Sequence, residues 1–147
     1  MNMENGLKLE RIEIEPLKSF NGIEFGTSRE DIWKKIGKPP CGSFRKSEYE
    51  KSDTDDYKYF HIYYDENYNF EAIDIFNDID IYCNGNKLSK KYSEILEFFK
   101  NVYDDIIEDE DGFVSIKGSI GVYLENDEDD LDVITFANKG YYDYMSE

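Results

Sequence analysis

The chain contains an internal repeat, and this repeat restricts the folds that it can adopt. The first copy comprises FHIYYDEN at residues 60–67 and FEAIDIFN at 70–77, and the second comprises IGVYLEND at 120–127 and LDVITFAN at 131–138. Apolar and polar residues alternate in these segments, as they do in the half-buried strands of a hairpin. Each hairpin follows a predicted helix, which itself follows a short strand. We therefore expect two related units of about 60 residues, each with the order strand, helix and antiparallel hairpin.

Two helices are predicted from their end signals and periodicity. In the first, Thr27 stands three residues before Glu30, which is the spacing of a capping box, and Gly37 ends the helix. In the second, from near Ser89 to Tyr103, apolar residues recur at the i, i+3, i+4, i+7 spacing of an amphipathic helix. Most of the remaining sequence alternates with a period of two. This pattern predicts strands near residues 9–15, 43–49, 57–64, 69–76, 79–83, 112–117, 119–125 and 131–137.

These elements predict an α+β fold in one domain, residues 1–147. The two units occupy about residues 9–77 and 79–138, and a Tyr-rich tail follows at 139–147. We expect the units to form antiparallel sheets with the helices packed on one face. Alternation in the hairpins places one set of side chains on the face toward the helices, namely Phe60, Ile62, Tyr64, Ile120, Val122 and Leu124.

The net charge of the chain is −17, from 34 Asp and Glu against 17 Lys and Arg. Aromatic residues make up 16% of the chain, which provides material for a core and argues against disorder. A charge of this size repels phosphate groups, so we expect no binding to nucleic acid and none to an anionic membrane. A basic protein is the partner that this charge favours.

The acidic excess lies entirely after residue 50, because residues 1–50 contain nine basic and nine acidic side chains. Its densest parts are two runs, which we expect to be loops. Like charges at such density repel each other, so the runs are either a solvated surface or a feature that steers a basic partner. Their side chains are Asp104, Asp105, Glu108, Asp109, Glu110 and Asp111 in the first run, and Glu125, Asp127, Glu128, Asp129, Asp130 and Asp132 in the second.

A second candidate surface is the face of the first hairpin that lies opposite the core. Alternation assigns Tyr57, Tyr59, His61 and Tyr63 to this face, and Tyr123 to the matching face of the second unit. Tyrosine offers a large contact area at low entropic cost and is enriched at protein interfaces, so these residues are candidate partner-binding anchors. The alternative is that the N-terminal strand or the neighbouring unit covers the face. The C-terminal tail either caps the sheet edge or adds exposed surface.

No motif of enzyme chemistry stands out, so we expect no catalytic residue, no cofactor and no metal. The lone histidine, His61, has no recognisable nucleophile motif beside it. Cys41 and Cys83 are 42 positions apart and form no metal-binding cluster with it. Two glycine-centred windows, tested as EF-hand loops, lack the required ligands. Loose calcium binding by the turn at 125–132 is an alternative that stays open.

Targeting signals are also absent from the sequence. The N-terminus has acidic residues early and no apolar run of signal-peptide length, and no stretch approaches the roughly 20 apolar residues of a membrane span. We therefore expect a cytoplasmic protein with reduced cysteines. We also expect it to be a monomer when free.

The segment at residues 22–39 reads GIEFGTSREDIWKKIGKP. It resembles a pattern of small bacterial αβ-repeat proteins, G-I-x-x-G-x-S-R-E-[DE]-[IV], which closes with I/L-G-K-P. The pattern occurs in small lipoproteins of outer-membrane assembly, in β-lactamase-inhibitor-like tandem repeats, and in immunity proteins of polymorphic-toxin and contact-dependent growth inhibition systems. The chain lacks a lipobox cysteine and an export signal, so a cytoplasmic immunity protein fits best among these. The motif encodes a helix cap and stop, and it implies no binding residue.

The sequence as a whole predicts an immunity protein that binds and neutralises a cognate basic toxin domain, such as a nuclease. The acidic runs would steer the partner, and the tyrosines would anchor it. Two alternatives stay open, a DNA mimic that inhibits a restriction or DNA-binding protein, and an acidic ligand- or calcium-binding module. A DNA mimic should spread its carboxylates along an elongated face at regular intervals, whereas this sequence bunches them.

Overall fold

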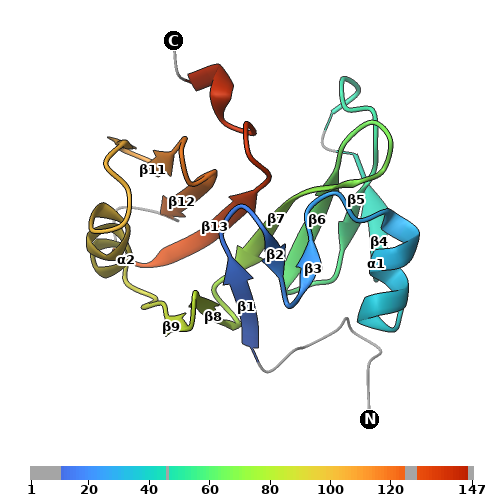
Figure 1. The fold of residues 1–147 in the computed structure, drawn as a ribbon, viewed down its shortest axis with the longest axis horizontal. Helices are drawn as coiled ribbons and strands as arrows, with labels where there is room; N and C mark the ends of the chain where they lie inside the picture. The colour runs from blue at the N-terminus through green and yellow to red at the C-terminus, as the bar shows by residue number, and fades with distance from the viewer. Residues whose placement is uncertain (1–10, 46, 125–128, 146–147) are drawn as a thin grey trace.

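A computed structural model describes residues 11–45, 47–124 and 129–145 of the chain (Figure 1). This part of the chain is mixed α/β, with mostly antiparallel sheets and two α-helices, α1 (Arg29–Ile36) and α2 (Tyr92–Lys100). At this level the predicted combination of helices and antiparallel sheets is confirmed.

The smaller sheet has five strands in the order β3-β2-β1-β8-β9. Its central pair is parallel, and Ile12 lies opposite Ile81. The parallel pair departs from the predicted antiparallel sheets, because its two strands come from opposite halves of the chain. The side chains that alternate toward the core are buried, namely Ile12, Ile14, Ile81 and Cys83. The strands are β1 (Arg11–Glu15), β2 (Ser19–Phe20), β3 (Ile23–Glu24), β8 (Asp80–Cys83) and β9 (Asn86–Lys87).

The larger sheet has eight strands in the order β10-β11-β12-β13-β7-β6-β5-β4, and every neighbouring pair is antiparallel. The strands are β4 (Gly42–Phe44), β5 (Thr54–Asp56), β6 (Phe60–Tyr64), β7 (Phe70–Phe76), β10 (Ile106–Asp109), β11 (Gly112–Ser115), β12 (Ile120–Leu124) and β13 (Leu131–Ala137). The two central strands, β7 and β13, pair in a register that places Asp74 opposite Thr135. From this pair outward, the strands of each half follow one another in reverse order of sequence.

Both sheets and both helices contribute to one buried cluster. Ile32 of α1 and Ile95 and Phe99 of α2 lie in this cluster with side chains of both sheets. Phe20 of β2 meets Phe60 of β6 at 5.6 Å between ring centroids. Figure 1 shows β1 and β2 in front of the larger sheet, so this aromatic contact joins the two sheets across the core.

The helix ends agree with the sequence signals in part. Helix α1 is capped by Ser28, whose Oγ accepts from the backbone N–H of Asp31 at 3.2 Å. The predicted Thr27 cap is wrong, because the Thr27 hydroxyl donates to the carbonyl of Glu24 instead, at 2.7 Å. Gly37 ends the helix as predicted, in a left-handed conformation (φ 95°) that glycine adopts without a steric penalty. Helix α2 is shorter than the predicted range at both ends.

Two strands of the larger sheet were not predicted, and both contain acidic residues. β10 lies within the first acidic run, so the assignment of that run to a loop is wrong. β10 pairs with β11 on one side alone, and charged side chains are tolerated at such a sheet edge. The strand predicted at 43–49 is instead β4, paired with the acidic strand β5. No helix in the described ranges is long and apolar enough to cross a membrane.

Candidate functional site

One residue from each acidic run, Glu108 and Asp129, contacts the first turn of α2. Oη of Tyr92 donates to Glu108 at 3.2 Å, and the backbone N–H of Tyr92 donates to the carbonyl of Asp129 at 3.0 Å. Burial, and then the carboxylates of Glu108, Asp109 and Asp129, raise the pKa of Tyr92. Runs that are separate in the sequence thus meet in space. We use the name acidic surface for the exposed carboxylates Glu108, Asp109, Glu110, Asp111 and Asp129.

Asp129 completes the N-terminus of α2. The N-cap residue, Lys91, makes no side-chain capping bond. Instead, the Asp129 carboxylate accepts from the backbone N–H of Ser93 at 2.8 Å and from Ser93 Oγ at 2.6 Å. These bonds satisfy a backbone donor that has no partner within the helix, and they lower the pKa of Asp129. A helix N-terminus also carries partial positive charge, which favours the nearby carboxylates.

Two carboxylates of the first run hold turns of the chain. Asp105 is half-buried and accepts from Ser115 Oγ at 2.7 Å. Asp109 accepts from the backbone N–H groups of Asp111 at 2.8 Å and of Gly112 at 3.1 Å, which closes the turn between β10 and β11. In the described chain, no hydrogen bond or ion pair holds the carboxylates of Glu110 and Asp111. The side chains of these two residues therefore contribute less to holding the fold than the other carboxylates of the acidic surface.

Two lysines offset part of the negative charge beside the acidic surface. Lys117 lies 2.7 Å from Asp104, and Lys91 lies 2.9 Å from Asp130. Both pairs are largely exposed to solvent, so each contributes little to stability. The other members of the second run are Asp132, which is half-buried in β13, and Glu125, Asp127 and Glu128, which lie outside the described residues.

The structure separates the residues of the predicted Tyr-rich face. Tyr57 has 0% exposure, stacks on Phe60 at 5.2 Å and donates to the carbonyl of Lys38 at 3.0 Å. The backbone at Lys58 is left-handed (φ 74°), so the alternation is broken before β6 begins. The assignment of Tyr57 to the outer face is therefore wrong, because its ring turns into the core.

Tyr63 lies on the outer face, but the C-terminal tail covers it. Its exposure is 8%, and it clusters with Ala72 and Ala137 under the ring of Tyr141. Oη of Tyr63 donates to Asp74 at 2.7 Å, and burial together with this carboxylate raises the pKa of Tyr63. The cover on this part of the face is therefore the tail, rather than the N-terminal strand.

The tail continues over β12 toward the acidic surface. Oη of Tyr142 lies 3.2 Å from Oη of Tyr123, and Tyr142 is 4% exposed. A Cβ atom at Gly121 would lie 2.5 Å from Tyr142 Oη, so any side chain here would displace a tyrosine hydroxyl beneath the tail. Tyr144, in the short helix η1 (Asp143–Met145), is 71% exposed. In the sequence, nothing distinguishes Tyr144 from the other tyrosines of the tail.

Tyr59 and His61 are half-buried in the first half of the chain. The ring of His61 lies between Phe44 at 5.2 Å and Phe76 at 4.9 Å, and its Nε2 is 3.3 Å from the carboxylate of Asp56. Tyr59 packs against the main core. These contacts give both side chains a structural role. His61 lies on β6 and Tyr59 directly before it, away from the acidic surface.

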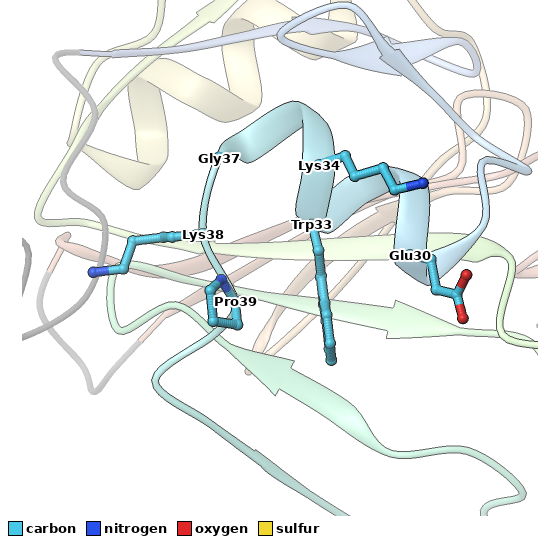
Figure 2. A pocket seen from close by; sticks show the side chains of 6 residues that line it. All are labelled: Glu30, Trp33, Lys34, Gly37, Lys38 and Pro39. Atoms are coloured by element: carbon cyan, nitrogen blue, oxygen red, sulfur yellow. The ribbon is translucent and has the colours of Figure 1, made fainter.

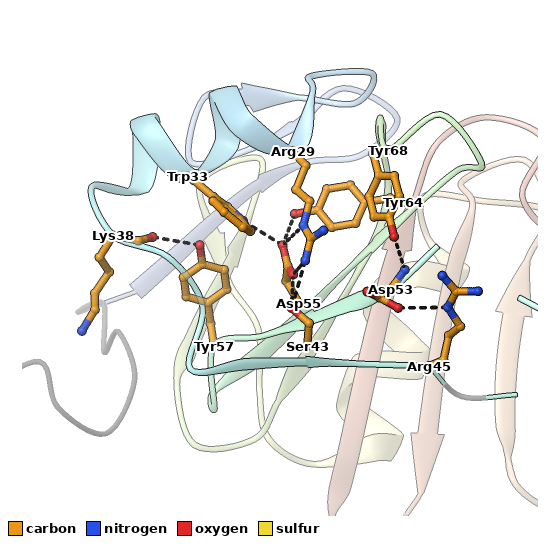
Figure 3. A network of polar contacts seen from close by, with 10 residues as sticks. All are labelled: Arg29, Trp33, Lys38, Ser43, Arg45, Asp53, Asp55, Tyr57, Tyr64 and Tyr68. Carbon is orange, nitrogen blue, oxygen red and sulfur yellow. Dashed lines mark hydrogen bonds and ion pairs between the residues drawn. The ribbon is translucent and has the colours of Figure 1, made fainter. Parts of the chain in front are cut away.

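A buried carboxylate that the sequence analysis missed organises the other end of the larger sheet (Figure 3). Asp55 of β5 has 0% exposure. It accepts from Arg29 Nε at 3.1 Å and Nη2 at 2.6 Å, and from Trp33 Nε1 at 2.8 Å. Ser43 Oγ at 2.8 Å and Tyr64 Oη at 2.6 Å also donate to it. Helix α1 and strands β4 and β6 are thereby tied to one side chain.

This network fixes the position of the only tryptophan. Burial by itself would raise the pKa of Asp55, but the hydrogen bonds from its donors outweigh burial and lower that pKa. The Arg29 guanidinium lies 4.8 Å from the ring centroid of Trp33, within cation–π range. The four-residue spacing of Arg29 and Trp33 signals a shared helix face. No sequence signal distinguishes Asp55 from its neighbours Asp53 and Asp56.

The described residues contain no metal-binding cluster, and the buried one of the two thiols is poorly reactive. No group of three or more His, Cys, Asp or Glu side chains in these ranges is placed to hold a metal ion. Both cysteines are free; Cys41 is exposed and Cys83 is buried. Burial raises the pKa of the Cys83 thiol to about 12, which disfavours the reactive thiolate.

Comparisons of the chain with models of protein families, with curated proteins and with solved structures find no match. Function is therefore argued from the surfaces themselves. The acidic surface around α2, with the exposed Tyr144 and half-buried Tyr123 near it, is the candidate site with the strongest chemical character.

Proposed function

We propose that this protein is an immunity protein, which binds and neutralises a cognate toxin domain with a basic surface, such as a nuclease, in the cytoplasm. The observation that carries the proposal is that Glu108 of the first acidic run and Asp129 of the second meet at the first turn of α2. A nuclease holds phosphates with cationic groups, and the acidic surface is complementary to such a cleft. The resemblance of residues 22–39 to a pattern found in immunity proteins supports the same class.

The charge around α2 is suited to steering a basic partner. Residues 101–132 contain twelve carboxylates and one lysine. Hydrogen bonds from neutral donors, such as Ser93, leave the charge on Asp129 in place. Concentrated charge of one sign raises the association rate of an oppositely charged partner, and salt weakens this effect. The same charge opposes contact between two copies, so we propose a monomer when free.

The anchors of the proposed interface differ from those predicted from the sequence. Tyr57 and Tyr63 are buried and offer no contact area in the folded protein. Tyr123 lies opposite Gly112 in the sheet, next to the turn that bears the acidic surface. Tyr144 is the exposed ring of the tail that packs over Tyr123. We therefore propose Tyr144, supported by Tyr123, as the aromatic anchor, since aromatic side chains commonly dominate binding energy at interfaces.

The alternative of a DNA mimic receives less support from the arrangement of carboxylates. A mimic of the phosphate backbone needs regularly spaced charges along an extended face. Here Asp109 and Asp129 are used to hold a turn and a helix end, and the exposed carboxylates lie on the β10–β11 turn and beside the N-terminus of α2. This compact cluster favours one cationic cleft over an extended groove-binding surface.

We further propose that the chain is a tandem of two related αβ units with both helices on the same face of the larger sheet. The alignment of the two halves matches Asp74 with Thr135, and the central register places these two residues opposite each other. Ile12 and Ile81, in the first strands of the halves, are also paired. The reversed strand order on either side of the central pair supports the same duplication.

The test is complex formation with the C-terminal domain of a secreted toxin encoded beside the gene for this chain. We expect the two proteins to copurify after coexpression and the chain to protect cells from that domain. Separate elution from a sizing column, together with no protection, would contradict the proposal.

Charge reversal then tests the acidic surface. We expect the double variant Glu110→Lys/Asp111→Lys to lower the association rate about tenfold at low salt and to flatten its salt dependence. Neither carboxylate holds a turn or a helix end in the described chain, so the fold should persist. The matched control is Glu24→Lys/Glu48→Lys, which makes the same change in net charge at exposed residues of the first half. An equal effect of both double variants would remove the acidic surface from the mechanism.

A further inference from the structure

An apolar slot lies beside the C-terminal end of α1 (Figure 2). Its volume is about 630 Å³, and its lining residues are Glu30, Trp33, Lys34, Gly37, Lys38 and Pro39. The side chains of Trp33 and Pro39 project side by side and form its walls. Gly37 ends the helix with a left-handed backbone, which turns the chain back and brings Pro39 beside Trp33.

The tryptophan in this slot is held in place before any ligand arrives. Its Nε1 donates to the buried carboxylate of Asp55 at 2.8 Å, and the Arg29 guanidinium lies 4.8 Å from its ring centroid. The polar atom of Trp33 is therefore already satisfied, and the part of the ring in the slot needs apolar contact alone. A fixed side chain loses little further entropy on binding, which favours its use as an anchor.

The slot lies in a cationic stretch of this acidic chain. Residues 32–47 contain five Lys and Arg and no Asp or Glu. Lys38 lies at the Pro39 side of the slot, whereas Glu30 lies at the opposite side of Trp33 (Figure 2). The Lys38 end is thus complementary to a carboxylate, and the middle of the slot to an apolar ring.

We propose that this slot docks an acidic segment of a second protein, which inserts one aromatic side chain between Trp33 and Pro39 and places a carboxylate beside Lys38. The proposal goes beyond the proposed function, because this surface has the opposite charge preference to the acidic surface. The two helices, α1 and α2, lie at opposite ends of the molecule in Figure 1. The two surfaces can therefore be tested separately.

The open form of the slot favours a protein segment over a free small molecule. Glu30, Lys34, Gly37 and Pro39 are exposed, while Trp33 and Lys38 are half-buried. Sites for small molecules enclose most of the surface of their ligand. When a partner protein inserts an aromatic side chain, the backbone of that partner covers the open side of the slot. Aromatic rings also stack favourably on an indole, so the inserted side chain is aromatic.

Trp33 is the only tryptophan of the chain, so its fluorescence reports directly on the slot. The probe is a synthetic peptide, acetyl-Asp-Asp-Phe-Asp-Asp-amide, titrated into the full chain with excitation selective for tryptophan. We expect a saturable change in emission. We expect Lys38→Glu to raise the Kd about fivefold and Glu30→Gln to lower it. The control Lys35→Glu changes an exposed lysine on the same helix that does not line the slot, and it should leave the Kd within twofold of the wild-type value, as an estimate from surface electrostatics.

The controls separate docking from general charge effects. A peptide with Ala in place of Phe, or with Lys in place of Asp, should give no saturable change. The proposal is wrong if the Phe peptide gives no saturable change, or if Lys35→Glu weakens binding as much as Lys38→Glu. Thermal unfolding confirms that each variant is folded, and Lys38→Gln replaces Lys38→Glu if the latter is not. None of these residues belongs to the acidic surface, so failure here leaves the proposed function standing.

Discussion

Thr135 donates its hydroxyl to the carboxylate of Asp74 at 2.5 Å, from the position directly opposite on the neighbouring strand. The second oxygen of the same carboxylate accepts from Tyr63 Oη at 2.7 Å. The two donors come from β13 and β6, which flank β7 on either side. One side chain therefore links three adjacent strands at the junction of the two halves.

Removing the hydroxyl of Thr135 tests the value of this link. Thr135→Val keeps the side-chain shape and loses the donor, so we expect the free energy of unfolding to fall by about 1.5–3 kcal/mol, the range for a bond to a charged group. Thr135→Ser is the control, because it keeps the donor, and it should retain most of the stability. Urea unfolding measures both variants. If Thr135→Ser lowers the free energy of unfolding as much as Thr135→Val does, the effect comes from side-chain packing and not from the hydrogen bond.

The Asp55 network should be the most sensitive polar feature of the first half. Asp55→Asn removes the charge that compensates Arg29, whose side chain is only 20% exposed. We expect a loss of about 3 kcal/mol, since breaking a buried pair leaves the other charge uncompensated. Urea unfolding at neutral pH measures this loss in the free energy of unfolding. The control is Asp53→Asn, which breaks a largely exposed pair with Arg45 and should change stability by well under about 1 kcal/mol.

The same carboxylate predicts a pH dependence. The pKa of Asp55 is lowered in the folded protein below its ordinary value of 3.8. Its contribution to stability is therefore fully present above the unfolded pKa and is lost as pH falls through the lower folded pKa. We expect the stability gap between wild type and Asp55→Asn to narrow below about pH 4. Parallel curves of unfolding free energy against pH would contradict the role of the ionised carboxylate.

The tail over β12 depends on the absence of a side chain at position 121. Gly121→Ala would place a Cβ atom 2.5 Å from Tyr142 Oη and 2.6 Å from Tyr123 Oη. We expect a loss of about 1–3 kcal/mol from overpacking, and faster proteolysis of residues 139–145. Adding Tyr142→Phe and Tyr123→Phe removes both clashing hydroxyls and should restore part of the protection. If proteolysis of the tail is unchanged in Gly121→Ala, the tail does not rest on this glycine.

Neighbouring acids of the second run should differ in their effect on stability. Asp129→Ala removes the bonds that cap the first turn of α2, so we expect a lower melting temperature and faster amide exchange at Ser93. Asp130→Ala breaks an exposed pair with Lys91 and should change little. Thermal unfolding and hydrogen exchange compare the two variants, which change net charge equally. Equal effects would show that charge alone, rather than capping, is responsible.

The regular parts of the fold were predictable from the sequence because their signals are local. Period-two alternation located three hairpin strands, Phe70–Phe76, Ile120–Leu124 and Leu131–Ala137, within one residue at each end. It placed the start of the fourth, Phe60–Tyr64, three residues too early. The edge strand β10 was missed, since Asp and Glu are depleted in strands and its pairing with β11 is a tertiary effect. Tyr57 was misplaced because the left-handed residue Lys58 breaks the alternation, and nothing marks such a residue when it is not glycine or asparagine.

The candidate sites were predictable only in part, for a different reason. The density of acid in residues 101–132 is a property of the sequence, but its gathering around α2 depends on the pairing of β10 and on Asp129. The Asp55 network combines residues from α1, β4, β5 and β6, so its partners are 9 to 26 positions away from it. Contacts at such separations are set by the sheet order, which local patterns do not specify.

The open edge of the larger sheet gives the acidic residues one more consequence. Among the described strands β10 is terminal, so its outer side carries backbone donors and acceptors that no described strand uses, with Ile107 43% exposed beside them. Such an edge can pair with a strand of another molecule, which extends the sheet from one molecule to the next. If the β10 strand of a second copy paired with this edge, its Glu108 and Asp109 would lie beside those of the first copy. The carboxylates of the two copies would then repel each other. The carboxylates that favour a basic partner thus also oppose polymerisation of the protein by pairing of its edge strands.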